Sequence, residues 1–125
     1  MATSVLYVED EAFFGEILPQ QLNAQGFEAL LAGNAEEAFR LLDTRAFDVI
    51  LLDLLLPGLD GFEILKKIKS LSDRKDIPVI IMSNLDTPID RSKAKELGAV
   101  GFMVKASTGP DEIGAAITAL LKPAK

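Results

Sequence analysis

The chain has 125 residues, of which 49% are hydrophobic and 26% charged, as is typical of one globular domain. Its formal net charge of -6 argues against nonspecific nucleic-acid binding, which requires Lys and Arg to neutralise phosphates. The sequence contains no cysteine and no histidine, which excludes disulfides, thiolate zinc sites, serine–histidine nucleophiles and imidazole ligands. Any chemistry must therefore come from carboxylates, hydroxyls, lysines and the backbone.

The sequence shows no sign of a targeting or membrane segment. The residues after Met1 lead directly into a strand-like run without the basic stretch of a secretory signal. Apolar runs are far shorter than the ~20 residues that a bilayer span requires. No repeat, low-complexity tract or linker interrupts the chain. We therefore predict one cytoplasmic domain over residues 1–125 that binds neither membrane nor nucleic acid.

Short apolar runs alternate with amphipathic stretches along the chain. The runs with the length of strands are Ser4–Val8, Phe27–Leu31, Val49–Leu52, Val79–Met82 and Val100–Val104. Several are apolar without alternation, as expected for parallel strands that are covered on both faces. Apolar side chains at helical spacing mark four of the helices, at Phe14, Ile17, Leu18 and Leu22, at Ala35, Ala38, Phe39 and Leu42, at Phe62, Leu65, Ile68 and Leu71, and at Ile113, Ala116, Ile117, Leu120 and Leu121.

Local signals mark the ends of these helices. Asn34 opens a start that resembles a capping box, and Gly26 is suited to terminate the first helix. Pro88 and Pro110 stand where helices begin, because a proline at the first helical position loses no hydrogen bond. Pro19 falls inside the first helical stretch, where we expect a kink or a 3₁₀-like start.

The fourth helix, roughly Pro88 to Leu97, has the weakest apolar stripe. Ile89, Lys93, Ala94 and Leu97 are expected to share its inner face, and the helix is expected to pack less firmly than the others. With this helix the pattern becomes (βα)₅, a parallel sheet with helices on both faces. Sheets of this kind bind ligands beyond the carboxyl ends of their strands.

Polar side chains gather at four of the five predicted strand ends. The first strand ends in Glu9, Asp10 and Glu11, the third in Asp53, the fourth in Ser83 and the fifth in Lys105. Taken singly, such a residue is commonly a cap or a solvated side chain, and we interpret Glu11 in that way. Complementary groups at four strand ends favour a functional site at this edge of the sheet.

This set of side chains suits phosphoryl transfer. An aspartate that follows an apolar strand can be held rigidly, and it is a competent nucleophile toward phosphorus. Crowded carboxylates favour a hard cation such as Mg²⁺, which neutralises charge as the phosphoryl group moves. Lys105 can offset a further phosphate charge, and the Ser83 hydroxyl can donate a hydrogen bond to a phosphoryl oxygen.

The sequence resembles the receiver domains of two-component response regulators over essentially its whole length. The matching segments are Val8 to Glu11, Asp53 to Gly61 with Pro57 four and Gly61 eight residues after the aspartate, Met82-Ser83 and Val104-Lys105. The resemblance implies a flavodoxin-like α/β fold of three layers, doubly wound around a five-stranded parallel sheet in the order 2-1-3-4-5. It also implies a phosphoacceptor signalling domain rather than an enzyme.

The resemblance implies roles for the acidic residues and for the lysine. Asp53 would accept the phosphoryl group from a phosphohistidine donor and would also ligate Mg²⁺. Asp10 would bind the ion directly, Glu9 would assist through water, and Leu55 would contribute its backbone carbonyl. Lys105 would pair with Asp53 and later with the phosphate.

The resemblance also implies a switch and partners. Ser83 would move toward the phosphoryl group, and Phe102 matches the aromatic residue that turns inward with it, although a plain packing role is the alternative for Phe102. The donor would be a sensor histidine kinase or a histidine phosphotransferase. An effector domain or protein would read the face formed by the fourth helix, fifth strand and fifth helix. The domain would be a monomer or a weak phosphorylation-dependent homodimer.

Several positions depart from the usual receiver pattern. Ala106 follows Lys105 where receivers commonly have proline after a cis peptide bond, so either the peptide is trans and Lys105 is aimed elsewhere, or the loop is strained. Asn84 stands where a small residue is common, and Leu55 and Leu85 flank the site where polar residues can guide water. We hypothesise that Leu55, Asn84 and Leu85 restrict water and prolong the life of the acyl phosphate.

Three alternatives remain. A haloacid-dehalogenase-type phosphatase needs an acid two residues after its nucleophile, and Leu55 occupies that position. A flavodoxin-like FMN module needs a phosphate-binding loop after the first strand, where Glu9–Glu11 would repel a phosphate. A degenerate receiver would bind partners without phosphorylation, a possibility that Ala106 and Asn84 favour and that the intact acidic residues oppose.

Overall fold

The computed structural model describes residues 3–10, 12–54, 61–71, 76–84 and 87–121. Strands and helices alternate along this part of the chain, with a short 3₁₀ turn, η1, before the last helix. The elements are β1 (Ser4–Val8), α1 (Ala12–Ala24), β2 (Glu28–Ala32), α2 (Ala35–Thr44), β3 (Val49–Asp53), α3 (Gly61–Ser70), β4 (Val79–Ser83), α4 (Pro88–Glu96), β5 (Gly101–Val104), η1 (Lys105–Ser107) and α5 (Pro110–Leu121).

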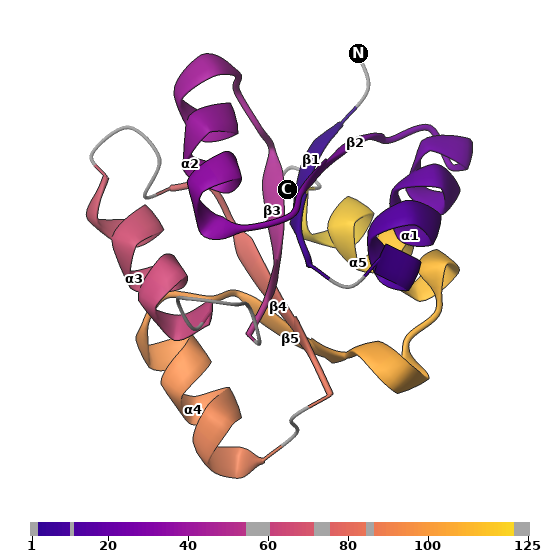
Figure 1. Ribbon diagram of the computed structural model, residues 1–125. Coiled ribbons are helices and arrows are strands. Elements are labelled where there is room, and N and C mark those ends of the chain that lie inside the picture. The colour runs from indigo at the N-terminus through magenta and orange to yellow at the C-terminus, as the bar shows by residue number, and fades with distance from the viewer. Residues whose placement is uncertain (1–2, 11, 55–60, 72–75, 85–86, 122–125) are drawn as a thin grey trace.

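The strands form a parallel sheet in the order β2-β1-β3-β4-β5, which confirms the predicted flavodoxin-like topology. Figure 1 shows α2, α3 and α4 on one face of the sheet and α1 and α5 on the other. Each face has its own buried apolar cluster, and side chains alternate between the two along β1, where Leu6 and Val8 join one cluster and Val5 and Tyr7 the other.

Double coverage explains why the central strands show no polar alternation. Every residue of β3 and β4 is buried, because the side chains of one face meet α2 to α4 and those of the other meet α1 and α5. The register pairs Asp53 with Met82 and Ser83 with Val104. The polar ends of neighbouring strands are therefore brought to one edge of the sheet.

The predicted boundaries agree with the observed strands to within one residue at each end. The differences matter at two positions, because Asp53 and Ser83 are the last residues of β3 and β4 rather than the first residues beyond them. Pairing with the neighbouring strands therefore holds the backbone of both residues at the edge of the sheet.

Several predicted helix ends are also present. The Asn34 side chain accepts a hydrogen bond of 2.8 Å from the Glu37 amide and caps α2. Gly26 has a φ of 98°, the left-handed conformation that glycine adopts without steric cost. α1 runs as an α-helix from Ala12 through Pro19, so the alternative of a 3₁₀-like start was wrong.

The predicted inner face of α4 was wrong at Ile89, which is 78% exposed, and at Lys93, which is also exposed. Ala94 is the buried residue of this helix, and Lys93 places its ammonium 4.6 Å from the centre of the Phe62 ring on α3. A small side chain and a cation–π contact bring α4 close to its neighbours without a large apolar surface. Ile17 of α1 is likewise at the rim rather than inside, at 38% exposed.

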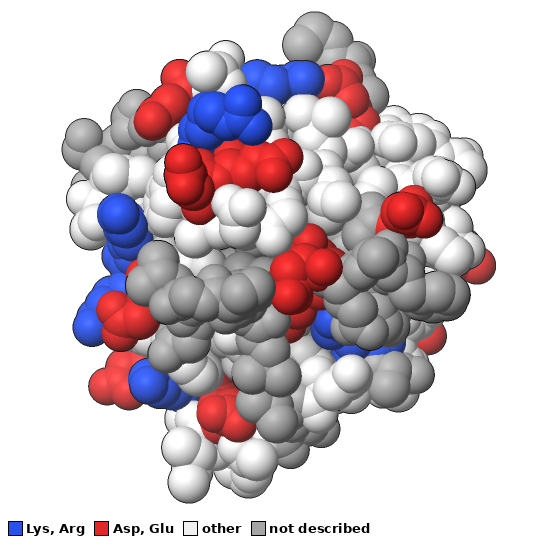
Figure 2. All heavy atoms as spheres, in the orientation of Figure 1, with Lys and Arg blue, Asp and Glu red and all other residues white. Residues whose placement is uncertain are grey.

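Charged side chains of both signs are interspersed over the face shown in Figure 2, so the negative net charge is not gathered into one acidic patch there. Within the described ranges, none of the helices has the length and apolar character needed to cross a membrane.

Candidate functional site

Four buried polar side chains meet at the carboxyl edge of the sheet. Glu9 follows β1, Asp53 ends β3, Ser83 ends β4 and Lys105 follows β5. Their exposed fractions are 1%, 3%, 0% and 7%, respectively, and they are the buried polar or charged residues of the described chain. Burial of charged groups costs several kcal/mol per ion unless partners compensate, so this concentration requires an explanation.

Lys105 supplies part of that compensation. Its ammonium lies 3.2 Å from Oδ2 of Asp53 and 2.5 Å from Oε1 of Glu9. Burial alone lowers the pKa of Lys105, but the hydrogen bonds and charges of Glu9 and Asp53 outweigh this effect and raise the pKa above its usual range. The ammonium therefore stays protonated and bridges two carboxylates that would otherwise repel each other.

A third carboxylate makes the site a candidate metal centre. One carboxylate oxygen each of Glu9, Asp10 and Asp53 lies within 4.8 Å of the others, and Asp10 is the exposed member of the group. One ammonium balances only one of these three negative charges. Carboxylate oxygens are the ligands that a hard divalent cation prefers, so this set of donors fits such an ion.

Gly61 lies in close contact with the backbone of Asp53 and Leu54. A Cβ atom at this position would lie 2.5 Å from Cα of Leu54 and 2.7 Å from the carbonyl oxygen of Asp53. The Gly61 amide also donates a hydrogen bond of 2.8 Å to the Leu54 carbonyl. The start of α3 can approach the end of β3 this closely only because residue 61 has no side chain.

The geometry around Lys105 decides between the two outcomes considered for the Lys105–Ala106 peptide. No peptide bond within the described ranges is cis, yet the lysine still reaches Asp53. The idea that a trans peptide would aim Lys105 elsewhere was therefore wrong, because η1 begins at Lys105 itself and its side chain turns back toward β3. Asn84 is exposed, whereas Leu55 and Leu85 lie outside the described residues, so their effect on water remains a prediction.

Sequence reasoning missed Tyr7, which belongs to the same network. Its phenol is fully buried and donates a hydrogen bond of 2.9 Å to Oε1 of Glu9. A signal was available in the sequence, because residues two apart on a strand share a face and Tyr7 stands two residues before Glu9.

The comparisons with known proteins agree with this arrangement. Residues 5–118 match the response regulator receiver domain family. The chain belongs to this family. The receiver domain is 37% identical over 103 residues to the sensory transduction protein RegX3 of Mycolicibacterium smegmatis, which covers 82% of this chain and 44% of that protein. It is 31% identical over 122 residues to the alkaline phosphatase synthesis transcriptional regulatory protein PhoP of Bacillus subtilis, covering 98% of this chain and 50% of PhoP.

A solved structure gives the same result. The chemotaxis protein CheY4 of Vibrio cholerae superposes with a TM-score of 0.90 at 26% identity, covering 97% of this chain and 100% of that one. The receiver domain spans about half the length of the curated relatives that it matches. Receiver domains are phosphoacceptor signalling modules rather than enzymes, and the acidic cluster is typical of the family's Mg²⁺ site. Membership of the family therefore sets aside the phosphatase and FMN-binding alternatives.

Phe102 of the receiver domain lies on β5 beside α4. It is partly buried against the core cluster of the α2–α4 face, and the Arg91 guanidinium lies 4.8 Å from the centre of its ring. Ser83 is fully buried at the end of the neighbouring strand β4. A shift of the Phe102 side chain would therefore change its contact with Arg91 of α4.

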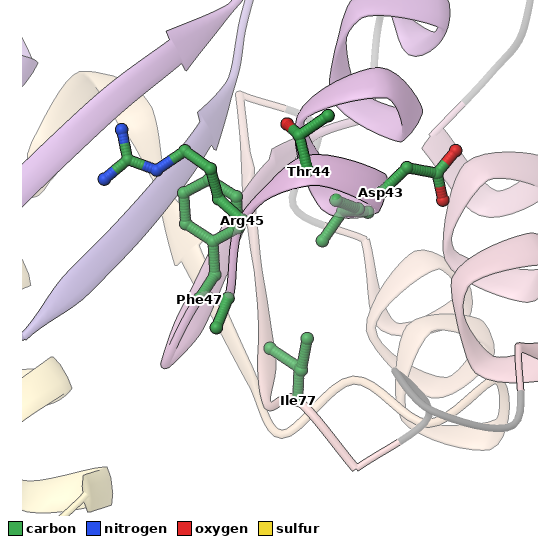
Figure 3. Close-up of a pocket in the computed structure, with 7 residues that line it drawn as sticks. Asp43, Thr44, Arg45, Phe47 and Ile77 are labelled. Carbon is green, nitrogen blue, oxygen red and sulfur yellow. The ribbon is translucent and has the colours of Figure 1, made fainter.

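A hollow elsewhere in the receiver domain is separate from this site. Residues 42–47 and Ile77 line it, and both segments precede strands, so it lies at the opposite end of the sheet. Figure 3 shows Arg45 and Asp43 directed to opposite sides of the hollow. Arg45 forms an ion pair with Glu28 of β2. We interpret this hollow as space between α2 and the starts of the strands.

Proposed function

We propose that residues 1–125 act as one receiver domain that accepts a phosphoryl group on Asp53 from a phosphohistidine of a sensor histidine kinase or histidine phosphotransferase. The observation that carries this proposal is the contact of Lys105 with both Asp53 and Glu9 at a buried sheet edge. Such an arrangement concentrates negative charge around one cation, and family membership supplies the donor class.

The transfer can be written from the side chains of the site. The Asp53 carboxylate attacks the phosphorus, the phosphorus–nitrogen bond to the donor imidazole breaks, and the departing nitrogen keeps the electron pair and takes a proton from solvent. The product is an acyl phosphate on Asp53. The Lys105 ammonium, already 3.2 Å from Oδ2, then faces the new phosphoryl oxygens, and the Ser83 hydroxyl can donate to one of them.

We propose that Mg²⁺ is the cofactor. Asp10 and Asp53 would hold it directly, Glu9 would act through water, and the Leu55 carbonyl, which lies outside the described residues, is added by resemblance to the family. When bound, the ion neutralises the charge that develops on the transferred group. The three carboxylates within 4.8 Å of one another support this assignment.

The output that we propose is a change in the face formed by α4, β5 and α5, read by an effector. Phosphorylation adds roughly -1.5 to -2 charges and three acceptor oxygens. A state in which Ser83 and Lys105 both reach the phosphate is favoured by those added contacts. Ser83 ends β4, and α4 is the next element along the chain. Phe102 on β5 contacts Arg91 of α4, so a movement of Ser83 and Phe102 would change the surface formed by α4 and β5.

Intact mass spectrometry after incubation with acetyl phosphate and Mg²⁺ tests the acceptor. We expect one added phosphoryl group on the wild type, none on Asp53→Asn, and an unchanged gain on Asp43→Asn, a control at an exposed aspartate of α2. A wild type that never gains mass, together with intact folding, would favour a receiver that works without phosphorylation.

Backbone amide shifts with beryllofluoride and Mg²⁺ test the output face. We expect the largest changes in α4, β5 and the start of α5. Changes confined to α1 would contradict the proposed face.

A further inference from the structure

Tyr7 is fully buried although it carries a polar hydroxyl. It lies on β1, the strand between β2 and β3, and its side chain is 0% exposed. Its ring packs in the apolar cluster formed with α1 and α5, which includes Leu18, Leu22 and Ile113. A phenylalanine would satisfy this packing equally well, so the packing does not account for the hydroxyl.

The hydroxyl is accounted for by Glu9. The Tyr7 phenol donates to Oε1 of this buried carboxylate at 2.9 Å, and hydrogen bonds to an ionised acceptor are stronger than neutral ones. The same oxygen lies 2.5 Å from the Lys105 ammonium. The ammonium in turn lies 3.2 Å from Asp53. A continuous row of contacts thus joins the phenol of β1 to the acceptor carboxylate of β3.

We propose that Tyr7 is a positioning residue of the phosphoacceptor site, because its phenol fixes the Glu9 carboxylate that holds Lys105 against Asp53. This inference rests on the proposed function. A glutamate side chain has several rotatable bonds, and the long lysine side chain that shares Oε1 is mobile as well. The tyrosine ring is buried in the apolar cluster, so its hydroxyl is the rigid donor among Tyr7, Glu9 and Lys105.

Two consequences follow for the chemistry. Without the phenol, Glu9 can turn, and Lys105 loses its fixed place between the two carboxylates. The cation that Glu9 and Asp53 would help to hold also loses part of its preformed site. Removal of a group that orients a metal ligand typically costs about 10- to 100-fold in affinity or activity.

The variant Tyr7→Phe tests this, because it removes one oxygen and leaves the ring. Thr118→Val is the matched control, since it removes a hydroxyl that donates a 3.0 Å hydrogen bond to Gly114 on α5, away from the site. We expect Tyr7→Phe to label with acetyl phosphate about tenfold more slowly at saturating donor and to bind Mg²⁺ about tenfold more weakly by calorimetry. The control should change neither quantity.

A purely structural role for the phenol predicts a different result. Tyr7→Phe would then unfold more easily, but the folded protein would label and bind Mg²⁺ as the wild type does, and this outcome would overturn the inference. A wild type that is never labelled would sink the proposed function instead, so the two failures are distinguishable.

A second measurement uses the unmodified protein and does not depend on the variant's folding. Tyr7 is the only tyrosine and the chain has no tryptophan, so tyrosine emission reports this phenol alone. Hydrogen bonding to a carboxylate quenches tyrosine emission, and we expect Mg²⁺ to change its intensity with the same midpoint as the calorimetric titration. Constant emission across a titration in which calorimetry shows binding would refute the coupling.

Discussion

The close approach of α3 to β3 makes Gly61→Ala the sharpest test of how the site is built. The added Cβ would lie 2.5 Å from Cα of Leu54 and 2.7 Å from the carbonyl oxygen of Asp53. Ordinary carbon contacts lie near 3.5 Å, so the two segments must separate by about 1 Å. Both neighbours are backbone atoms that no rotamer change can move aside.

The magnitude follows from two opposing effects. Overpacking of a close contact costs about 1–3 kcal/mol, and a clash with backbone belongs at the upper end of that range. Alanine is better than glycine in a helix by up to about 1 kcal/mol, and residue 61 is the first residue of α3. We therefore expect Gly61→Ala to lower the free energy of unfolding by about 2 kcal/mol.

Gly33→Ala provides the matched control. A Cβ at residue 33 would meet only the flexible Glu37 carboxylate, at 3.9 Å. The substitution should leave stability unchanged or raise it by about 0.5 kcal/mol, because alanine has less freedom than glycine in the unfolded chain.

Urea unfolding at equilibrium measures both variants. A lower midpoint at constant m-value for Gly61→Ala, with a constant or higher midpoint for Gly33→Ala, is the expected pair of results. Labelling by acetyl phosphate should slow in the first variant alone, because the shifted carbonyl belongs to Asp53. A Gly61→Ala protein that unfolds within about 0.5 kcal/mol of the wild type would refute the close-approach argument.

Three further predictions concern charge and burial. Without Mg²⁺, Asp10→Asn should raise the free energy of unfolding by up to about 1 kcal/mol, because it removes repulsion among carboxylates within 4.8 Å of one another. An excess of Mg²⁺ should cancel this gain in stability. A variant that is less stable than the wild type in EDTA would contradict the reasoning. The pKa of Lys105 is raised in the folded protein, so this residue contributes stability that is lost as the pH rises above the ordinary lysine value. Burial lowers the pKa of Lys69, with partial compensation by the charge of Asp76, so the contribution of Lys69 to stability rises with pH instead. The free energy of unfolding is measured against pH in metal-free buffer from about pH 9 to 11. Its slope should become less negative in Lys105→Met and more negative in Lys69→Met. Slopes that shift in the same direction in both variants would be inconsistent with these environments. Ser4 Oγ is buried without a protein hydrogen-bond partner in the described chain, so Ser4→Ala should cost nothing or stabilise slightly in the same urea assay, and a loss above about 1 kcal/mol would show that the hydroxyl is satisfied.

Much of the fold could be predicted because it follows from local patterns. Apolar runs without alternation indicate strands covered on both faces, and the β3 run ending at Asp53 is an example. Parallel strands point their carboxyl ends to one edge, so the polar residues after such runs must gather there. The prediction failed where the pattern was weak, as at Ile89, because a helix with little apolar surface can be oriented by a cation–π contact that periodicity does not reveal.

By itself the sequence determined the alternation of strands and helices and which polar groups share the sheet edge, since both depend on residue order along single elements. Only the tertiary structure decided that Tyr7 and Lys105 meet on the same oxygen of Glu9, and that residue 61 must have no side chain. The physical reason is that these contacts depend on distances between β1, β3, β5 and α3, and tenths of an ångström separate a hydrogen bond or a clash from no contact at all. Such distances are set by the packing of the whole core and by no segment alone.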